Sequence, residues 1–238
     1  MLKKEMTTYE RMTRMFDHKE ADRVPITDSP WAGTIMRWTQ EGVPEGADWR
    51  EFFGIDLIEQ FGVDNSPRYP YQVLEETEDY IISKSSWGVT MKQFKHADST
   101  PEFLDFTVTT AEKWKEAKAR MTFSEDRFDW AHLEKNYRRF REEGRWLQLG
   151  FWFGFDVTHS WMVGTETLLV AMLEEPEWVV DMFNHYLDMC IMHYEKVLEK
   201  GYTFDAITWP DDMGYKGTQF FSLDLYRNLL KPVHKRAA

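Results

Sequence analysis

The chain is poor in cysteine, in positive charge and in long apolar runs, and each shortage excludes a class of protein. Cys190 is the only cysteine among 238 residues, so no internal disulfide can form and the reducing cytoplasm is the expected location. Aspartate and glutamate number 41 against 29 lysines and arginines, and the net charge of −12 argues against nucleic acid and anionic membranes as partners. No apolar run approaches the ~18 residues of a membrane span.

The motifs of common cofactors and nucleophiles are also missing. The sequence contains no GxGxxG after a strand, no GxxxxGK[ST], no HExxH and no GxSxG. His185 and His193 lie eight residues apart on one predicted helix. Metal-ligating histidines on one helix are normally four residues apart, so we predict no metal site within this chain.

The chain does contain enough apolar material for a sizeable core, with 42% hydrophobic and 16% aromatic residues. Short runs of strand-forming residues alternate with stretches of helical period, which predicts an α/β fold with a parallel sheet. The predicted strands cover residues 24–26, 55–61, 146–153 and 206–209. A closed barrel needs eight strands, so about four indicate a truncated fold.

The first predicted helix has Thr7 or Thr8 as its N-cap, the long helix at 176–200 ends at Gly201, and the last runs from 223 to about 230, before Pro232. Residues 101–109 are predicted to be a connector and residues 155–164 an aromatic loop.

Residues 73–95 have a different character from the rest of the chain. Two strand-like runs, at 80–83 and 89–92, flank a turn at Trp87-Gly88. This pattern predicts a β-hairpin inserted at the rim of the domain.

Two aspartates are candidates for catalysis because each follows a predicted strand. Asp211 comes directly after the run AITWP, and Asp64 follows the strand predicted at 55–61. The carboxyl ends of parallel strands open into the site of α/β folds, so we expect both carboxylates in one pocket. For Asp64 and Asp212 the ordinary alternative is a turn or helix-capping aspartate.

The segment from Phe155 to Gly164 is expected to form a wall of that pocket. It follows a predicted strand and contains His159, Trp161 and Met162, which we predict to bind substrate. The alternatives are a loop histidine with ordinary hydrogen bonds and a core cluster of aromatic residues.

Three further residues are assigned to substrate binding. Asp212 and Tyr215 follow Asp211 closely and should line the pocket and its rim. Arg37, on a short predicted helix, could meet an acidic substrate, although an arginine on a solvated helix face is the commoner case.

Three stretches of the chain share their pattern with one family. ERMTRMFDHKEADRVPI matches an opening helix followed by DRVP, and GFDVTHSWMVGTETLL with EEPEWV matches a glycine-rich loop and helix. DAITWPDDMGYKGTQFFSLDLYRNLLKPVHKR matches a strand followed by Asp-Asp, Gly, Ser-x-x-x-Tyr-Arg and Lys-Pro. Together these stretches resemble the uroporphyrinogen decarboxylase superfamily, most specifically at both ends.

The resemblance implies a (β/α)8 TIM barrel, truncated to about its first half, with the β-hairpin insertion at about 73–95. Residues 1–238 would form the N-terminal part of one such domain. It implies an enzyme, a lyase that decarboxylates a porphyrinogen-type substrate in tetrapyrrole metabolism. Asp64 is the nearest match to the family's catalytic aspartate, offset by about one residue.

Two departures from the family pattern leave alternatives open. TDSPWAGTIMRW stands where true decarboxylases carry an arginine- and glycine-rich motif that grips the substrate carboxylates, and Arg37 alone does not replace it. The superfamily also contains zinc-dependent methyltransferases that act on a methylated substrate with a corrinoid protein. Their His-x-Cys zinc motif would lie beyond Ala238. Methyl transfer is therefore the first alternative, and a non-catalytic barrel fragment that binds a corrinoid or another ligand is the second.

Overall fold

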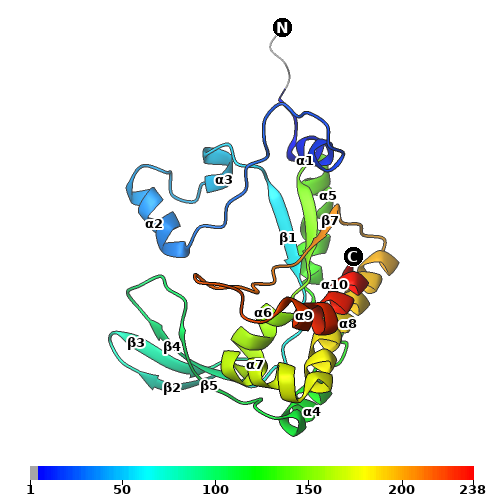
Figure 1. Ribbon diagram of the computed structural model, residues 1–238. Helices are drawn as coiled ribbons and strands as arrows, with labels where there is room; N and C mark the ends of the chain where they lie inside the picture. Colours follow the sequence, from blue (N-terminus) through cyan, green and yellow to red (C-terminus); the bar gives the residue numbers. More distant parts are fainter. Residues whose placement is uncertain (1–4) are drawn as a thin grey trace. The chain divides into compact units, whose positions relative to one another are not determined.

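The computed structural model describes residues 5–238, which form two compact units (Figure 1). Unit 1 combines the N-terminal residues up to Phe61 with residues 129–149 and 204–207. Unit 2 combines residues 62–128, 150–203 and 208–238. Each unit therefore depends on contacts between segments that are distant in the sequence.

Unit 1 contains a three-stranded parallel sheet in the order β1-β6-β7. The strands are β1 (Ile58–Gly62), β6 (Trp146–Gly150) and β7 (Ala206–Thr208). The central strand β6 buries Trp146, Leu147 and Leu149, as expected for a parallel strand covered on both faces. The helices of this unit are α1 (Thr8–Phe16), α2 (Ala32–Gln40), α3 (Trp49–Phe52) and α5 (Trp130–Glu142).

A buried ion-pair network accounts for the pattern of arginines and aspartates near the N-terminus. The Arg11 guanidinium donates to Asp22 at 2.7 Å and also to the fully buried Asp56, which accepts a second bond from Arg23 at 2.6 Å. Burial alone would raise the pKa of Asp56, but the Ile26 amide and the two arginines outweigh it and lower the pKa. The network thus connects α1 and the DRVP segment, residues 22–25, to Asp56, which lies just before β1.

Unit 2 contains a four-stranded antiparallel sheet in which successive strands are neighbours. The strands are β2 (Gln72–Glu76), β3 (Tyr80–Lys84), β4 (Val89–Phe94) and β5 (Glu102–Phe106). The helices are α4 (Ala111–Arg120), a 3-10 turn Glu125–Arg127, α6 (Phe155–Val157), a π-helical turn Thr158–Val163, α7 (Thr165–Glu174), α8 (Pro176–Glu199), α9 (Leu223–Leu225), a second π-helical turn Tyr226–Leu230 and α10 (Lys231–Ala237).

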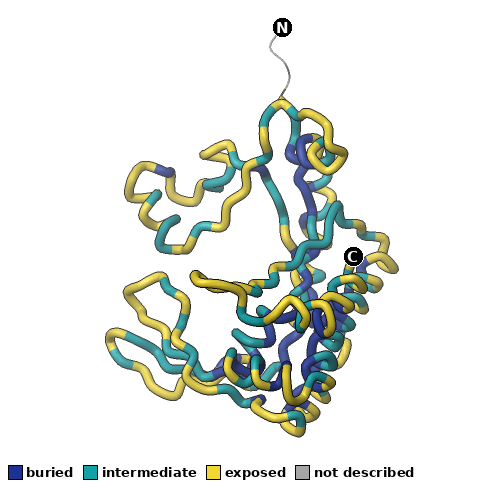
Figure 2. Tube along the Cα trace, in the orientation of Figure 1, coloured by how far each residue is buried: buried dark blue, intermediate teal, exposed yellow. Residues whose placement is uncertain are grey.

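The long helix α8 forms the centre of unit 2. It buries Val179, Phe183 and Leu187 completely, and α4, α7 and α10 pack against it (Figure 2). Among residues 5–238, no helix is both long enough and apolar enough to cross a membrane.

The expectation of a truncated (β/α)8 barrel is wrong. The described chain has three parallel strands, and its other sheet is antiparallel. The run at 24–26 was predicted as the first strand, but Val24 is 79% exposed and the Ile26 amide donates to the Asp56 carboxylate at 2.8 Å. Pro25 has no N–H to donate to a sheet, so this run is an extended connection rather than a strand.

The predicted hairpin insertion is larger than expected. The strands at 80–84 and 89–94 form the hairpin, but β2 and β5 extend it on both sides into the four-stranded sheet. Residues 101–109 were expected to be a connector, yet Glu102–Phe106 pairs with β4 as a strand.

Two segments are more helical than the sequence indicated. Residues 155–163 form α6 and a π-helical turn instead of a loop. The last helix was expected to end near Pro232, but α10 continues to Ala237. Pro232 lies just after the π-helical turn Tyr226–Leu230, and because proline has no N–H to donate, the regular helical hydrogen bonding is interrupted at this junction.

The ion-pair network generates a prediction for stability. Asp56→Asn keeps the size of the side chain but removes one of the two carboxylates that hold the buried Arg11, and the one that Arg23 contacts, so the unfolding free energy should fall by about 3–5 kcal/mol. Urea denaturation followed by circular dichroism measures the change. The control Glu41→Gln breaks the exposed Arg37–Glu41 pair and should cost less than about 0.5 kcal/mol. Equal losses in the two variants would contradict the role of the network.

Candidate functional site

The carboxylate of Asp211 joins two segments of unit 2 that lie far apart in the sequence. Its Oδ1 accepts a hydrogen bond from the backbone N–H of Asp156 at 2.7 Å, and its Oδ2 lies 2.8 Å from Nε2 of His234 on α10. The side chain is only 4% exposed. Asp211 therefore fixes the start of α6 against the C-terminal helix.

Gly154 allows this close approach. Its φ of +95° lies in the left-handed region, and a Cβ at this position would collide with the Asp211 carboxylate. The glycine between β6 and α6 is thus required both for the turn and for the position of Asp211.

Asp156 and His159 lie one helical turn apart and face each other across 3.8 Å, measured from Oδ1 to Nε2. Both remain accessible, with side-chain exposures of 20% and 12%. The indole N–H of Trp152 donates to Oδ2 of Asp156 at 3.2 Å. His159 also lies within hydrogen-bond distance of the hydroxyl groups of Thr165 and Ser160, at 3.0 and 3.1 Å.

The surroundings shift the pKa values of this pair in opposite directions. Burial raises the pKa of the Asp156 carboxyl, and the charges of Asp212 and Asp211 add to this effect. Burial also lowers the pKa of His159 from its ordinary value of 6.5, against the attraction of the three aspartates. His159 is therefore mainly neutral at pH 7, while Asp156 holds a proton more readily than an exposed aspartate.

Aromatic rings pack around the His159 imidazole. Phe155 stacks on His159 at a centroid distance of 4.6 Å, and Phe220 lies 5.3 Å from the same imidazole. Tyr215 packs on Phe220, with ring centroids 5.3 Å apart. The two residues lie on opposite arms of a short turn, in which Gly214 and Gln219 form an antiparallel β-bridge. The rings of Phe155 and Phe220 shield the imidazole from water and contribute to the burial that lowers the pKa of His159.

The predicted site residues of unit 2 are partly brought together. His159 and Asp211 both lie beside Asp156, and Asp212 is close enough to affect its pKa. Trp161 does not contact Asp156 directly but packs against Trp152, whose indole donates to Asp156; the ring centroids of the two tryptophans are 5.7 Å apart. Met162 is fully buried and belongs to the core, while Tyr215 is exposed at the turn.

Asp64 lies in a different setting. It accepts hydrogen bonds from Arg68 Nε and from the Ser66 hydroxyl, both at 2.6 Å, and its backbone exchanges hydrogen bonds with Arg127. Burial would raise the pKa of Asp64, but Ser66 and Arg68 outweigh it and lower the pKa. This is the environment of a structural loop carboxylate, the alternative that the sequence had left open.

Arg37 lies in unit 1 on an exposed face of α2. Its Nε donates to Glu41 one turn further along at 2.7 Å. The geometry is that of an ordinary surface ion pair on a helix.

Sequence reasoning missed two residues of the site. Asp156 was visible as a carboxylate following a predicted strand, the same signal that selected Asp64 and Asp211. His234 gave no signal, because it lies beyond Pro232, where the last helix was expected to end.

The described residues offer no ligand set for the zinc that the resemblance implies for methyltransferases. Within residues 5–238, no group of three or more His, Cys, Asp or Glu side chains is placed to hold a metal ion. Cys190 is fully buried on α8, and burial raises the pKa of its thiol to about 12, whereas a metal ligand is a thiolate. We therefore assign no reaction step to zinc.

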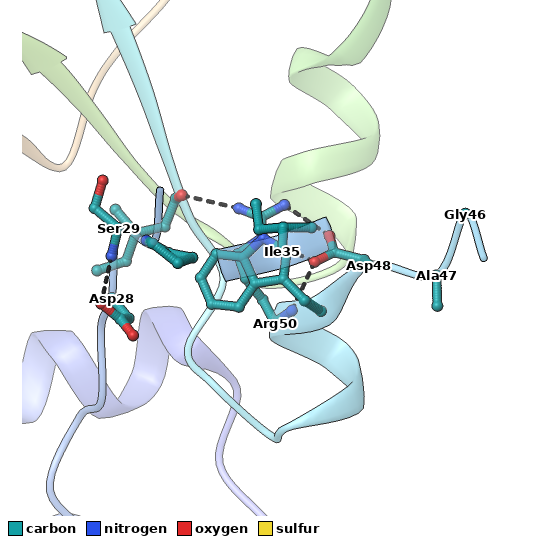
Figure 3. Close-up of a pocket in the computed structure, with 10 residues that line it drawn as sticks. Asp28, Ser29, Ile35, Gly46, Ala47, Asp48 and Arg50 are labelled. Carbon is teal, nitrogen blue, oxygen red and sulfur yellow. Dashed lines mark hydrogen bonds and ion pairs between the residues drawn. The ribbon is translucent and has the colours of Figure 1, made fainter. Parts of the chain in front are cut away.

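Unit 1 has a cavity of its own, of about 530 Å³, which is shown in Figure 3. Its lining includes Asp28, Asp48 and Arg50. The Arg50 guanidinium forms ion pairs with Asp48 at 2.8 Å and with Glu59 at 3.1 Å. Because its cation is neutralised in this way, the cavity is a weaker candidate than the Asp156–His159 pair.

No family model, curated protein or solved structure matches the chain. The likeness to the uroporphyrinogen decarboxylase superfamily therefore depends on the sequence motifs alone.

The lowered pKa of His159 predicts how stability depends on pH. Between this pKa and the unfolded value of 6.5, the folded state binds fewer protons, so the unfolding free energy should fall as the pH drops below 6.5. His159→Gln should lose less stability between pH 7.5 and 5.5 than the wild type, as measured by urea denaturation. His96→Gln, at an exposed position, should retain the wild-type loss. An unchanged pH dependence in His159→Gln would contradict the prediction.

Proposed function

We propose that this chain is an enzyme that decarboxylates a small organic acid by proton transfer at a ring carbon, the lyase chemistry that the resemblance implies. The observation that supports the proposal most is the Asp156–His159 pair, a carboxyl with raised pKa beside an imidazole with lowered pKa. Pairs whose pKa values are shifted in this way are typical of acid–base sites.

The proposed reaction has two proton transfers. Asp156, as the acid, protonates the ring carbon next to the one that carries the CH2–carboxylate side chain, and positive charge develops on the substituted carbon. The carbon–carbon bond to the carboxylate then breaks, CO2 leaves, and the electron pair neutralises the ring. A proton from solvent is then added to the exocyclic carbon while the first proton returns to Asp156, which restores the acid and leaves a methyl group or its equivalent.

The negative charges of the site fit this sequence of steps. Once Asp156 has given up its proton, its carboxylate lies beside the developing cation, and Asp212 and Asp211 add to the negative potential. The neutral His159 imidazole can relay a proton from solvent, because its ring nitrogens already contact two hydroxyl groups.

Asp211 has a positioning role in this proposal rather than a catalytic one. Both of its oxygens are engaged, by the Asp156 amide and by His234, and its side chain is almost inaccessible. Asp64 is assigned to structure because Arg68 and Ser66 hold it.

The two alternatives have less support. Methyl transfer with a corrinoid protein would use a zinc-bound thiolate as the nucleophile, a reaction in which the Asp156–His159 acid–base pair has no evident role. A purely ligand-binding protein would not need an acid and a base with shifted pKa values beside each other.

We place the proposed enzyme in the cytoplasm. Its one cysteine, Cys190, is buried in the core and free, as is usual for proteins of reducing compartments.

Asp156→Asn tests the proposed reaction because it removes the acid and keeps the size of the side chain. CO2 release is measured with uroporphyrinogen and with single-ring pyrrole and arene acetic acids. On the substrate that is turned over, Asp156→Asn should lower kcat about 100-fold or more. Asp64→Asn should stay within about tenfold of the wild type, because it alters a structural pair. CO2 release from none of these acids, or equal losses in the two variants, would contradict the proposal.

A further inference from the structure

We infer that Trp152 is a positioning residue for the proposed acid: its indole holds Oδ2 of Asp156, so that the acidic proton is on Oδ1, the oxygen 3.8 Å from the His159 imidazole. This inference rests on the proposed function and deepens it. It names the oxygen from which the proton is transferred and the side chain that selects this oxygen. Trp152 acts through Asp156 and takes no part in the reaction itself.

The two carboxyl oxygens of Asp156 have different neighbours. The indole N–H of Trp152 donates to Oδ2 at 3.2 Å, whereas Oδ1 lies 3.8 Å from Nε2 of His159, beyond the distance of a hydrogen bond. An indole nitrogen can only donate, so Oδ2 must be the acceptor of this bond. A proton on Oδ2 would lie against the indole hydrogen. The protonated carboxyl therefore carries its hydrogen on Oδ1.

The indole of Trp152 is held from several sides. Trp87 and Trp161 pack against its ring at interplanar angles of 73° and 68°, with centroid distances of 5.5 and 5.7 Å. The carbonyl of Trp152 accepts a hydrogen bond from the buried side chain of Asn65. These contacts restrict rotation of the indole and keep its N–H directed at Asp156.

The carboxyl side of the bond is held as well. Gly154, with a φ of +95°, turns the chain between Trp152 and Asp156, and the Asp156 amide donates to Asp211 at 2.7 Å. Both partners of the indole–carboxyl hydrogen bond are therefore anchored within unit 2. A catalytic group that is held in one orientation loses less entropy on reaching the transition state.

The His159 imidazole does not compete for the proton on Oδ1. Its Nδ1 lies 3.0 Å from the Thr165 hydroxyl, and its Nε2 lies 3.1 Å from the Ser160 hydroxyl, closer than the 3.8 Å to Asp156. Both ring nitrogens thus have nearer partners. The O–H of Asp156 remains available to a carbon of the substrate.

The indole also limits how far the pKa of Asp156 rises. Burial raises this pKa most, while the hydrogen bond from Trp152 lowers it, because an N–H donor stabilises the charged carboxylate more than the neutral carboxyl. The charged groups that act on the same carboxyl are His159, Asp212 and Asp211. A variant that lacks only the indole N–H keeps all three, so its pKa difference from the wild type reports the indole.

Trp152→Phe tests the inference, because it removes the N–H and keeps an aromatic ring. The Asp156 carboxyl, followed by 13C NMR, should titrate at a higher pH in this variant than in the wild type. The control Trp161→Phe makes the same change in the neighbouring ring, which does not contact Asp156, and should leave the titration unchanged. An unchanged titration in Trp152→Phe, or equal shifts in the two variants, would overturn the inference.

The hydrogen bond can also be followed without altering Trp152. In 1H–15N spectra of the wild type, the indole signal of Trp152 should move with pH at the midpoint of the Asp156 titration, because protonation replaces a charge-assisted bond with a neutral one. In Asp156→Asn this movement should disappear. A Trp152 signal that does not follow the titration would overturn the inference, whether or not Trp152→Phe folds.

The pH dependence of turnover separates the inference from the proposed function. The proposed reaction needs protonated Asp156, so kcat/KM falls as the pH rises through its pKa, and Trp152→Phe should move this fall to higher pH. The expected NMR shift without any CO2 release would support the position of the proton and reject the proposed function. CO2 release that requires Asp156, with no effect of Trp152→Phe on either titration, would reject the inference alone.

Discussion

The buried carboxylate of Asp211 is the contact on which the arrangement of the proposed site depends. One oxygen holds the backbone of Asp156 and the other holds His234, so a single side chain connects the start of α6, the segment after β7 and the last helix. The turn that follows carries Phe220 and Phe221, which pack against Phe155 and complete the aromatic surroundings. Loss of the carboxylate would remove both contacts at once and free the start of α6 from the last helix.

The carboxylates of this chain fall into two groups according to their partners. Asp56 is held by the Ile26 amide and two arginines, and Asp64 by Ser66 and Arg68; in both cases these contacts outweigh burial and lower the pKa. These two carboxylates stay charged and stabilise the segments just before and just after β1. Asp156 is half-buried, lies near Asp212 and Asp211, and accepts a hydrogen bond from the Trp152 indole; burial and the two aspartates outweigh the Trp152 and His159 contacts and raise its pKa. The difference between the two groups lies in the neighbours and not in the aspartates themselves, and it is the physical basis for separating structural from catalytic roles.

Part of this picture could be predicted from the sequence. Local signals located several helix ends: Thr7, one of the two N-caps predicted for the first helix, caps α1, and Gly201 follows the end of α8. His159 and Asp211 were selected because each follows a predicted strand, and both belong to the candidate site. The barrel was wrong because strand number and pairing are long-range properties, and the run at 24–26 is engaged by Asp56 instead of a sheet. The same local signal could not separate Asp64 from Asp156, because the arginine that pairs with one and the aspartates that lie near the other are set by tertiary contacts.

The central claim is that the fold gives Asp156 and Asp64 opposite electrostatic environments, and one titration tests it directly. The side-chain carboxyl carbons of aspartate can be followed by 13C NMR as the pH is varied, with the two signals assigned from Asp156→Asn and Asp64→Asn. The account predicts that Asp156 titrates above the ordinary value of 3.8 and Asp64 below it. A titration of Asp156 at or below 3.8, or the reverse order of the two groups, would contradict it.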